Sequence, residues 1–166
     1  MRNEIGIFDA YHETLEKLSG IGILLVAGEP PNSMTIGWGT IGEIWNMPVF
    51  TVLVRPTRYT FQLMEESTSF TICVLSSEFK KQLAVCGSKS GRDINKIKAC
   101  GFKMNPGIRI STPYIEESHF HYECRIVHKH RIDPLTLAKE IDDKYYPGKD
   151  WHMVYYGQIA GVFKNQ

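Results

Sequence analysis

Hydrophobic residues along this chain follow two repeats, one typical of helices and one typical of strands. Between Ile5 and Leu18, apolar side chains such as Phe8 and Leu15 recur at helical spacing, with acidic and basic residues on the other side. This pattern predicts an amphipathic helix that Gly20 ends. Short apolar runs follow, separated by Pro, Asn and Ser clusters that are typical of turns. They predict strands at residues 21–27, 34–42 and 49–54.

The second half of the chain alternates short helices with longer strands. Helices are expected at residues 59–66, at 78–85 with Ser77 as N-cap, and as a helical turn from Ser90 toward Lys98. Residues 101–118 are expected to form a loop, and residues 134–146 a helix or a loop. Strands are expected at residues 70–75, 119–132 and 151–163. Alternation in the long strand places Phe120, Tyr122, Cys124 and Ile126 on one face and His119, His121, Glu123 and Arg125 on the other.

Strands outnumber helices in this prediction, and most of them are neighbours in the sequence. This order favours an antiparallel barrel with a few helices over a sheet built from βαβ units. The length of 166 residues fits one hydrophobic core. We therefore expect a single mainly β (α+β) domain over residues 1–166.

Composition narrows the classes of function without naming one. Nineteen basic and 18 acidic side chains leave a net charge of +1, so the chain lacks the basic excess of a general nucleic-acid binder. The longest apolar run, Ile21–Ala27, is far shorter than the ~20 residues of a membrane span, and no signal-peptide pattern opens the chain. We predict a cytoplasmic protein without a membrane partner. Its four cysteines are expected to be reduced core thiols: Cys73, Cys86, Cys100 and Cys124.

The stretch from Met34 to Gly42 carries three glycines within a predicted strand. Glycine weakens a strand interior, so several glycines often mark a bulge or a place where a ligand approaches the backbone. Trp38, between two of them, could offer a stacking surface, and Thr35 and Thr40 add hydroxyl groups. A curved barrel strand with a core tryptophan explains the same residues equally well.

Two further segments combine cations and hydroxyl groups where helices are predicted to start. The first runs from Arg55 to Thr60 and the second from Ser88 to Asp93. Free N–H groups at a helix start, together with Arg, Lys, Ser and Thr side chains, suit a phosphate group. The alternative is a pair of capped helices with solvated cations.

Several other chemistries lack a supporting pattern. The chain contains no Walker loop, no G-x-G-x-x-G fingerprint after a strand and no G-x-S-x-G elbow. The pairs His119-x-His121 and His128-x-His130 have a spacing that metal sites use, but no further ligand cluster accompanies them. We predict no metal site. His152 is a lone histidine in the last strand, where a structural role is common.

In their order along the chain, these segments resemble the flavin reductase-like, FMN-binding split-barrel family that includes flavoredoxin. The resemblance covers nearly the whole chain from about Gly20 onward. It rests on residues 32–40, 54–60, 70–75, 90–96, 123–125 and 152–159.

The resemblance implies a six-stranded antiparallel split β-barrel with flanking short helices, and a homodimer with FMN near the subunit interface. The strand around Thr35 would lie along the isoalloxazine ring, and the two cation segments would receive the phosphate. The cofactor-binding residues implied are Met34, Thr35, Ile36, Trp38, Gly39, Thr40, Arg55, Pro56, Arg58, Tyr59, Thr60, Ser88, Lys89, Ser90, Arg92 and Lys96.

The same resemblance implies oxidoreduction or electron transfer through FMN, with either NAD(P)H or a redox protein as electron donor. Many members that use NAD(P)H carry Gly-Asp-His before the last strand. Here Gly148-Lys149-Asp150 is followed by Trp151 and then by His152, which makes His152 the candidate catalytic residue. The alternative function is a non-catalytic flavin- or ligand-binding barrel module without reductase activity.

Overall fold

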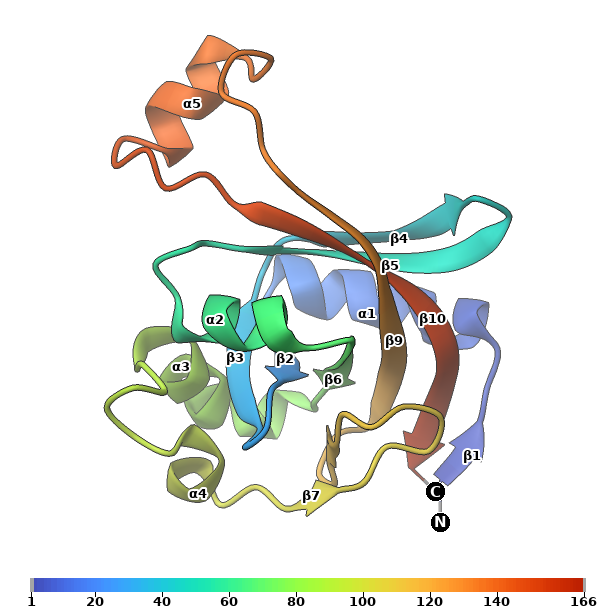
Figure 1. Ribbon diagram of the computed structural model, residues 1–166. Helices are drawn as coiled ribbons and strands as arrows, with labels where there is room; N and C mark the ends of the chain where they lie inside the picture. Colours follow the sequence, from blue (N-terminus) through green and yellow to red (C-terminus); the bar gives the residue numbers. More distant parts are fainter. Residues whose placement is uncertain (1, 166) are drawn as a thin grey trace.

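The computed structural model describes residues 2–165, and most of its strands belong to one antiparallel sheet (Figure 1). The sheet has eight strands in the order β3-β2-β6-β9-β10-β5-β4, with β1 paired to β10. Its strands are β1 (Arg2–Glu4), β2 (Ile23–Ala27), β3 (Asn32–Ile36), β4 (Gly39–Ile44), β5 (Met47–Val54), β6 (Ser69–Val74), β9 (Phe120–Arg131) and β10 (Met153–Asn165). A small second sheet pairs β7 (Met104–Asn105) with β8 (Tyr114–Ile115).

Short helices flank this sheet, as the sequence predicts. They are α1 (Ile7–Ser19), α2 (Tyr59–Glu66), α3 (Lys80–Ser88), α4 (Lys96–Cys100) and α5 (Lys139–Tyr145), with a 3₁₀ turn η1 (Ser77–Phe79) before α3. The predicted N-cap at Ser77 is wrong, because Ser77 is the first residue of η1 and Ser76 occupies the N-cap position. The helical turn predicted from Ser90 is present, because the N–H groups of Asp93 and Ile94 both donate to the Ser90 carbonyl at 3.2 Å. A separate short helix, α4, follows from Lys96, where the Asn95 side chain accepts a hydrogen bond from Lys98 N at 3.0 Å.

The mainly β, antiparallel fold with a few helices is confirmed, whereas the sheet holds eight strands rather than six. The strand predicted at 34–42 is two strands, β3 and β4, interrupted at Gly37 and Trp38. β3 pairs with β2, and β4 pairs with β5, so the chain changes partners at this interruption. β1, which lies ahead of the predicted helix, adds a further strand.

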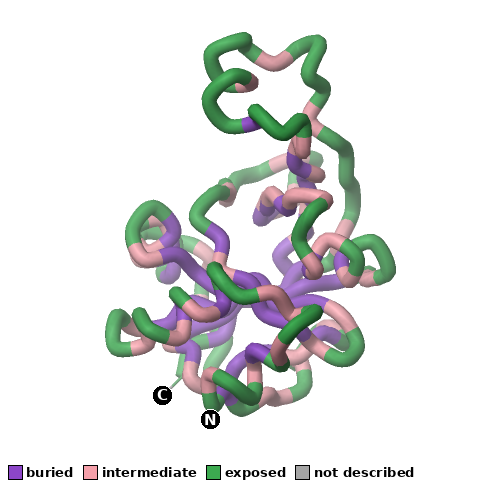
Figure 2. The backbone as a smooth tube through the Cα atoms, turned by 90° about the vertical axis from the view of Figure 1, so that its left-hand side faces the viewer, coloured by how far each residue is buried: buried purple, intermediate pink, exposed green. Residues whose placement is uncertain are grey.

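The sheet is covered on both faces near β2 and β6, and the buried residues lie at the centre of the molecule (Figure 2). One core holds large side chains such as Phe50, Phe70 and Tyr122 together with residues of α1 and α2. A second core joins Leu24 on β2 to Leu83 on α3. A strand that is buried on both faces needs apolar side chains at every position, which explains why residues 23–27 are all apolar.

The polar face predicted for β9 is buried in the first half of the strand. His121 and Glu123 are fully buried, with Nε2 and Oε1 3.2 Å apart. Tyr114 stacks on the His121 ring at 3.9 Å, and Glu123 accepts hydrogen bonds of 2.6 Å from the backbone N–H groups of Ile108 and Arg109. The segment predicted as a plain loop at 101–118 therefore covers this face.

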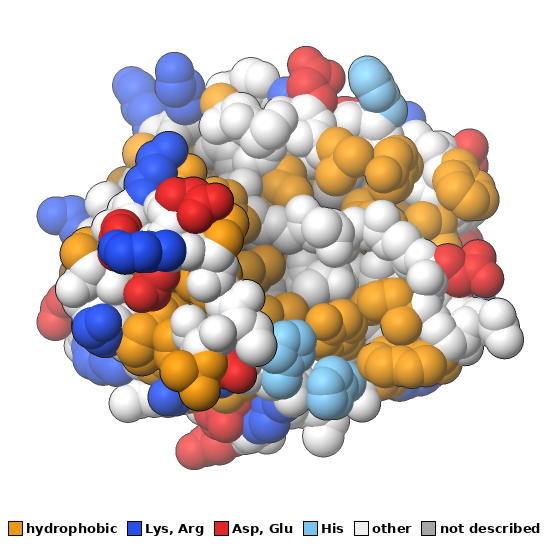
Figure 3. Space-filling view, turned by 90° about the horizontal axis from the view of Figure 1, so that it is seen from above, with side chains coloured by type: hydrophobic (Ala, Val, Ile, Leu, Met, Phe, Trp, Pro, Cys, Tyr) orange, Lys and Arg blue, Asp and Glu red, His pale blue; other side chains and the backbone are white. Residues whose placement is uncertain are grey.

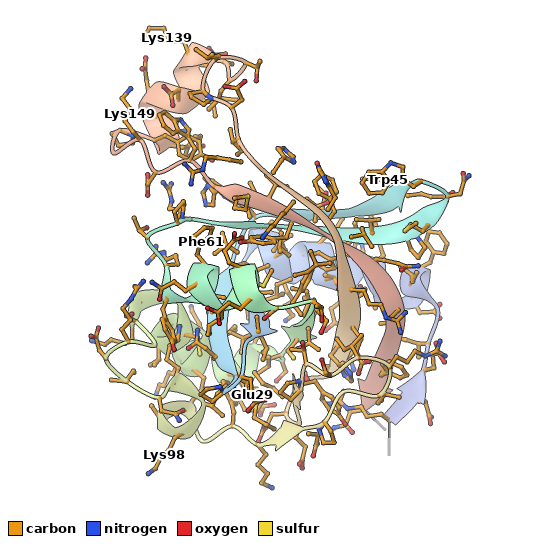
Figure 4. The ribbon with its side chains drawn as sticks, in the orientation of Figure 1. Glu29, Trp45, Phe61, Lys98, Lys139 and Lys149 are labelled. Atoms are coloured by element: carbon orange, nitrogen blue, oxygen red, sulfur yellow. The ribbon has the colours of Figure 1, made fainter. Side chains whose placement is uncertain are left out.

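The continuations of β9 and β10 carry residues 132–152, here called the arm, away from the rest of the protein (Figure 1). The arm contains α5, and Lys139 and Lys149 both lie on it, far from Trp45 on the β4–β5 hairpin (Figure 4). Arg55, just after β5, holds the base of the arm. Its guanidinium pairs with Asp150 at 2.6 Å and donates to the carbonyl of Tyr145 at 2.8 Å.

The sheet curls without closing. β3 and β4 are the two ends of the strand order, and they are consecutive in the chain but not paired with each other in residues 2–165. The outer edge of β3 therefore has backbone N–H and C=O groups without a strand partner. Gly37 and Trp38 link β3 to β4 across the seam between these strands, and the candidate site lies at this seam.

Candidate functional site

Two adjoining cavities lie at the seam. The first, of about 220 Å³, is lined by Met34, Thr35, Ile36, Gly37, Trp38, Leu53, Arg55, Arg58, Gly87 and His152. The second, of about 150 Å³, is lined by Met34, Thr57, Arg58, Tyr59, Thr60, Cys86, Gly87, Ser88, Lys89, Ser90, Gly91, Arg92 and Lys96. Because Met34, Arg58 and Gly87 line both, the two cavities form one elongated site.

The first cavity has an aromatic wall and a polar backbone edge. Trp38 is 43% exposed, so the interpretation that it is a core residue is wrong. Its ring meets Tyr145 edge-on at 5.2 Å and His152 at 5.3 Å. The polar side of the cavity comes from β3, whose unpaired edge can offer backbone N–H and C=O groups at Met34–Ile36. A flat ligand with donors and acceptors on its rim suits this cavity.

His152 lines the first cavity as a neutral imidazole at neutral pH. Its Nδ1 lies 2.8 Å from the hydroxyl group of Tyr146, which belongs to the arm. Burial, helped by the positive charge of Arg55, lowers the pKa of His152 to about 4. The side chain is therefore a hydrogen-bonding group here, with its charge suppressed.

We expect the pKa of His152 to make the protein less stable in mild acid. Between about pH 6.5 and pH 4 the unfolded chain protonates this histidine and the folded chain does not, so stability falls as the pH drops through that window. The effect is at most about 3 kcal/mol. Chemical denaturation at several pH values should show a shallower loss of stability for His152→Gln than for the unchanged protein. The other titrating groups are common to both proteins, so identical pH profiles would contradict the assignment.

The second cavity contains a buried cation without an acidic partner. The side chain of Lys96 is only 3% exposed, and its Nζ donates to the carbonyl of Cys86 at 3.1 Å. Within residues 2–165, no carboxylate lies within ion-pair distance of it. Burial lowers the pKa of Lys96, and the nearby Arg58 lowers it further. An anion in this cavity would relieve both costs.

Arg58 and Arg92 add positive charge to the same cavity. Arg58 is the N-cap residue of α2, and its guanidinium has no hydrogen bond or ion pair within the described part of the chain. Arg92 lies over the Tyr59 ring at 5.5 Å and donates to the carbonyl of Thr57 at 3.3 Å. Gly91 lets this loop approach closely, because a Cβ there would lie 2.5 Å from Tyr59 Cδ1.

The predicted cofactor residues divide into three groups in the structure. The first cavity gathers Met34, Thr35, Ile36, Trp38, Arg55 and Arg58, and also His152; the second adds Tyr59, Thr60, Ser88, Lys89, Ser90, Arg92 and Lys96. Gly39, Thr40 and Pro56 line neither cavity. Gly39 faces a separate hollow beside Trp38, and Thr40 pairs with Thr51 in the sheet.

Some lining residues were not singled out from the sequence. They are Gly37, Leu53, Thr57, Cys86, Gly87 and Gly91. Gly37, Thr57 and Gly91 stand inside the predicted segments and contributed to their glycine and hydroxyl content, but they are not among the predicted cofactor residues. Leu53, Cys86 and Gly87 come from β5 and α3 and reach the site only through the tertiary fold.

Arg55 lines the first cavity and also holds the arm in place. Its ion pair with Asp150, its hydrogen bond to Tyr145 and its position 5.0 Å above the Tyr146 ring all bind it to the arm. Trp151 also stays with the arm, since its indole N–H donates to Asp142 at 2.6 Å. Trp38 and His152, rather than Trp151, therefore form the aromatic side of this cavity.

The remaining histidines form no metal site within residues 2–165. No group of three His, Cys, Asp or Glu side chains there has suitable geometry. His128 and His130 are exposed and pack with Tyr156 and Trp45 instead. Over the same residues, every helix is too short or too polar to span a bilayer.

Residues 19–162 match the family described as "Flavin reductase like domain", which is most of the chain. The chain therefore belongs to the flavin reductase-like family. An uncharacterized protein of Archaeoglobus fulgidus is 30% identical over 115 residues, which are 69% of this chain and 64% of the relative. An uncharacterized protein of Pyrococcus abyssi is 28% identical over 99 residues, 60% of this chain and 56% of the relative. The chain thus spans less than two thirds of either relative's length.

Solved structures with the same fold include redox proteins. Flavoredoxin of Desulfovibrio vulgaris (Miyazaki F) aligns with a TM-score of 0.68 and 22% identity, over 87% of this chain and 69% of that one. An FMN-binding protein of Thermus thermophilus has the same TM-score and identity, over 87% of this chain and 70% of that one. An NADH:FAD oxidoreductase of Streptomyces globisporus aligns with a TM-score of 0.65 and 16% identity, over 87% of this chain and 75% of that one. At these identities the likeness establishes the split-barrel fold.

Proposed function

We propose that this chain binds FMN in the two adjoining cavities and takes part in oxidoreduction through it. The observation that carries the proposal is the buried side chain of Lys96, which has no carboxylate partner among the described residues and lies at one end of an elongated site. Trp38 forms a wall at the other end of this site. A phosphate would neutralise the cation end, and a flat ring system would fill the aromatic end. FMN joins these two groups in one molecule.

Each end of the site offers what that part of FMN requires. At the first cavity, the open edge of β3 can hydrogen-bond the polar rim of the ring, and Trp38 and His152 can contact its surface. At the second cavity, Lys96, Arg58 and the hydroxyl-rich loop at Ser88–Ser90 suit a phosphate. When bound, FMN supplies the hydride and electron chemistry, and the protein orients the cofactor and tunes its electrostatics.

The electron donor is proposed to be NAD(P)H or a redox protein. Trp151 donates its indole N–H to Asp142 on the arm and does not line the first cavity, so it does not itself occupy the place where a nicotinamide would approach. A neutral His152 can donate or accept a hydrogen bond there without bringing a charge. We assign His152 as the candidate catalytic residue on this basis.

We also propose a homodimer in which a second copy covers the site. Trp38 is exposed, and a hollow of about 460 Å³ opens on its other side, lined partly by Leu15 and Leu18 of α1. Figure 3 shows hydrophobic side chains both on the arm and on the broad surface beside it. Exposed examples are Trp38, Trp45, Val127, Leu135, Ile141 and Tyr145. We further propose that the protein is cytoplasmic, because its four cysteines are free thiols and thiols stay reduced in that compartment.

An anaerobic absorption experiment tests the proposed function. The purified protein is titrated with FMN and then given NADH, NADPH and finally dithionite. Saturable binding with a perturbed flavin spectrum is the expected result, and bleaching by a nicotinamide identifies a reductase. Bleaching by dithionite alone identifies a carrier that depends on a redox protein.

A matched variant locates the binding. Lys96→Met keeps an unbranched side chain of similar length without the charge and should bind FMN more weakly, whereas Lys98→Met, on the same short helix, should bind as the unchanged protein does. A protein that gains neither absorbance nor thermal stability with FMN contradicts the proposal, because a real site stabilises by RT ln(1 + [L]/Kd). Tighter binding of FAD than of FMN would change the cofactor assignment.

A further inference from the structure

Two of the four thiols lie next to each other beneath the second cavity. The sulfur atoms of Cys86 and Cys100 are 3.8 Å apart. Cys86 is buried near the end of α3, and Cys100, the last residue of α4, is partly exposed. Cys73 and Cys124 are fully buried, and neither has a sulfur neighbour within hydrogen-bonding distance in residues 2–165. Only the first pair therefore combines proximity with access from solvent.

The paired thiols enclose the segment that carries the cations of the second cavity. Residues 87–96 run from one cysteine helix to the other and include Lys89, Arg92 and Lys96. Cys86 itself lines the cavity, and its carbonyl oxygen accepts the hydrogen bond from the Lys96 ammonium group. Any displacement of Cys86 therefore reaches the cation side of the cavity directly.

We propose that Cys86 and Cys100 form a reversible redox modification site, in which a low-molecular-weight disulfide oxidises the two thiols to an internal disulfide. Cys100, the accessible thiol, attacks one sulfur of the small disulfide, which forms a mixed disulfide on Cys100 and releases the other half as a free thiol. Cys86 then attacks the Cys100 sulfur and releases the second thiol. Two protein thiols lose two electrons and two protons, and the small disulfide gains them as two free thiols.

The disulfide would change the second cavity. A bonded pair of sulfur atoms lies about 2.05 Å apart, so the two sulfurs must move roughly 1.7 Å closer than the present 3.8 Å. Cys86 also contacts the Ser33 hydroxyl group at 3.2 Å on β3, and that contact competes with the movement. Oxidation should therefore shift α3 against β3 and alter the fit of a phosphate; this consequence, unlike the disulfide itself, rests on the proposed function.

The oxidation is expected to be slow. Burial and the neighbouring Cys86 raise the pKa of the Cys100 thiol to about 12, which keeps it protonated at neutral pH. Since the thiolate is the attacking species, a protonated thiol reacts slowly. The pair suits a response to sustained oxidising conditions better than rapid turnover.

Oxidised glutathione is the probe for the chemical step. The purified, flavin-free protein is incubated with it, and intact mass and peptide mapping are measured over time. We expect a mass lower by two hydrogen atoms, a peptide cross-link between Cys86 and Cys100, and reversal by dithiothreitol. The Cys73→Ser, Cys124→Ser double variant should still form the cross-link. Cys86→Ser should instead stop at a glutathione adduct on Cys100.

Two results would overturn the modification site. One is a stable glutathione adduct on Cys100 in the unchanged protein, because Cys86 would then be unable to reach it. The other is a protein whose cysteines all stay unmodified after prolonged exposure.

Titration of the oxidised and reduced forms with FMN tests the consequence separately. Weaker binding by the oxidised form is expected, and equal affinities would contradict the coupling. If neither form binds FMN, the proposed function fails, while the cross-link still stands or falls on the mass measurement.

Discussion

Arg58→Ala is expected to weaken FMN binding by about one to two orders of magnitude. The guanidinium lines both cavities and has no protein partner in residues 2–165, so it is free to bind the ligand. A hydrogen bond to a charged group contributes about 1.5–3 kcal/mol. Fluorescence titration of FMN with the purified variant measures the loss directly.

Because Arg58 makes no ion pair within the described residues, its removal should leave the fold intact. Thermal denaturation without ligand should therefore change little, and added FMN should raise the melting temperature less than it does in the unchanged protein. Arg131→Ala is the matched control, since Arg131 is an exposed arginine at the end of β9 that lines neither cavity. An Arg58→Ala variant with unchanged FMN affinity would remove this residue from the proposed site.

Glu123→Ala is expected to destabilise the protein by at least about 3 kcal/mol, because each buried donor left without its acceptor costs about 1–3 kcal/mol. Burial alone would raise the pKa of Glu123, but the hydrogen bonds from His121 and from the N–H groups of Ile108 and Arg109 outweigh it and lower the pKa. Burial lowers the pKa of His121. The variant would leave these donors buried without an acceptor. Urea denaturation gives the free energy of unfolding.

Glu4→Ala provides a close comparison. Glu4 pairs with the side chain of the same Arg109 at 2.5 Å, but both side chains are about half exposed. An exposed ion pair contributes about 0–1 kcal/mol. Similar losses in the two variants would show that the buried carboxylate contributes no more than a surface pair, contrary to this interpretation.

Local patterns were sufficient for most of the fold because most of its elements are set by neighbouring residues. The apolar run at 23–27 and the amphipathic pattern of α1 appear almost as expected. The interruption at Gly37 and Trp38 could not be read from alternation, because it depends on which strand each half pairs with. Likewise, the burial of His121 depends on the rings of Tyr114 and Phe163, which come from other segments and are not reported by the alternation of β9.

The candidate site was predictable where its chemistry is concentrated in short segments. The loop at Ser88–Arg92 and the strand at Met34–Ile36 do line the cavities. Arg55 illustrates the limit, because its ion pair with Asp150 joins residues 95 positions apart. The sequence pattern predicts that Arg55 binds phosphate, whereas the fold also uses Arg55 to hold the arm through Asp150 and Tyr145.

The seam beside β3 has a consequence for the protein without its ligand. An unpaired strand edge is a template on which another chain can add a strand, and such edges promote aggregation. β3 carries no charged side chain that would repel a neighbour, and its edge faces a cavity where Met34, Thr35 and Ile36 line the candidate site. A ligand bound along this edge would therefore prevent another chain from pairing with it. Preparations without the ligand should aggregate at lower protein concentration than preparations with it.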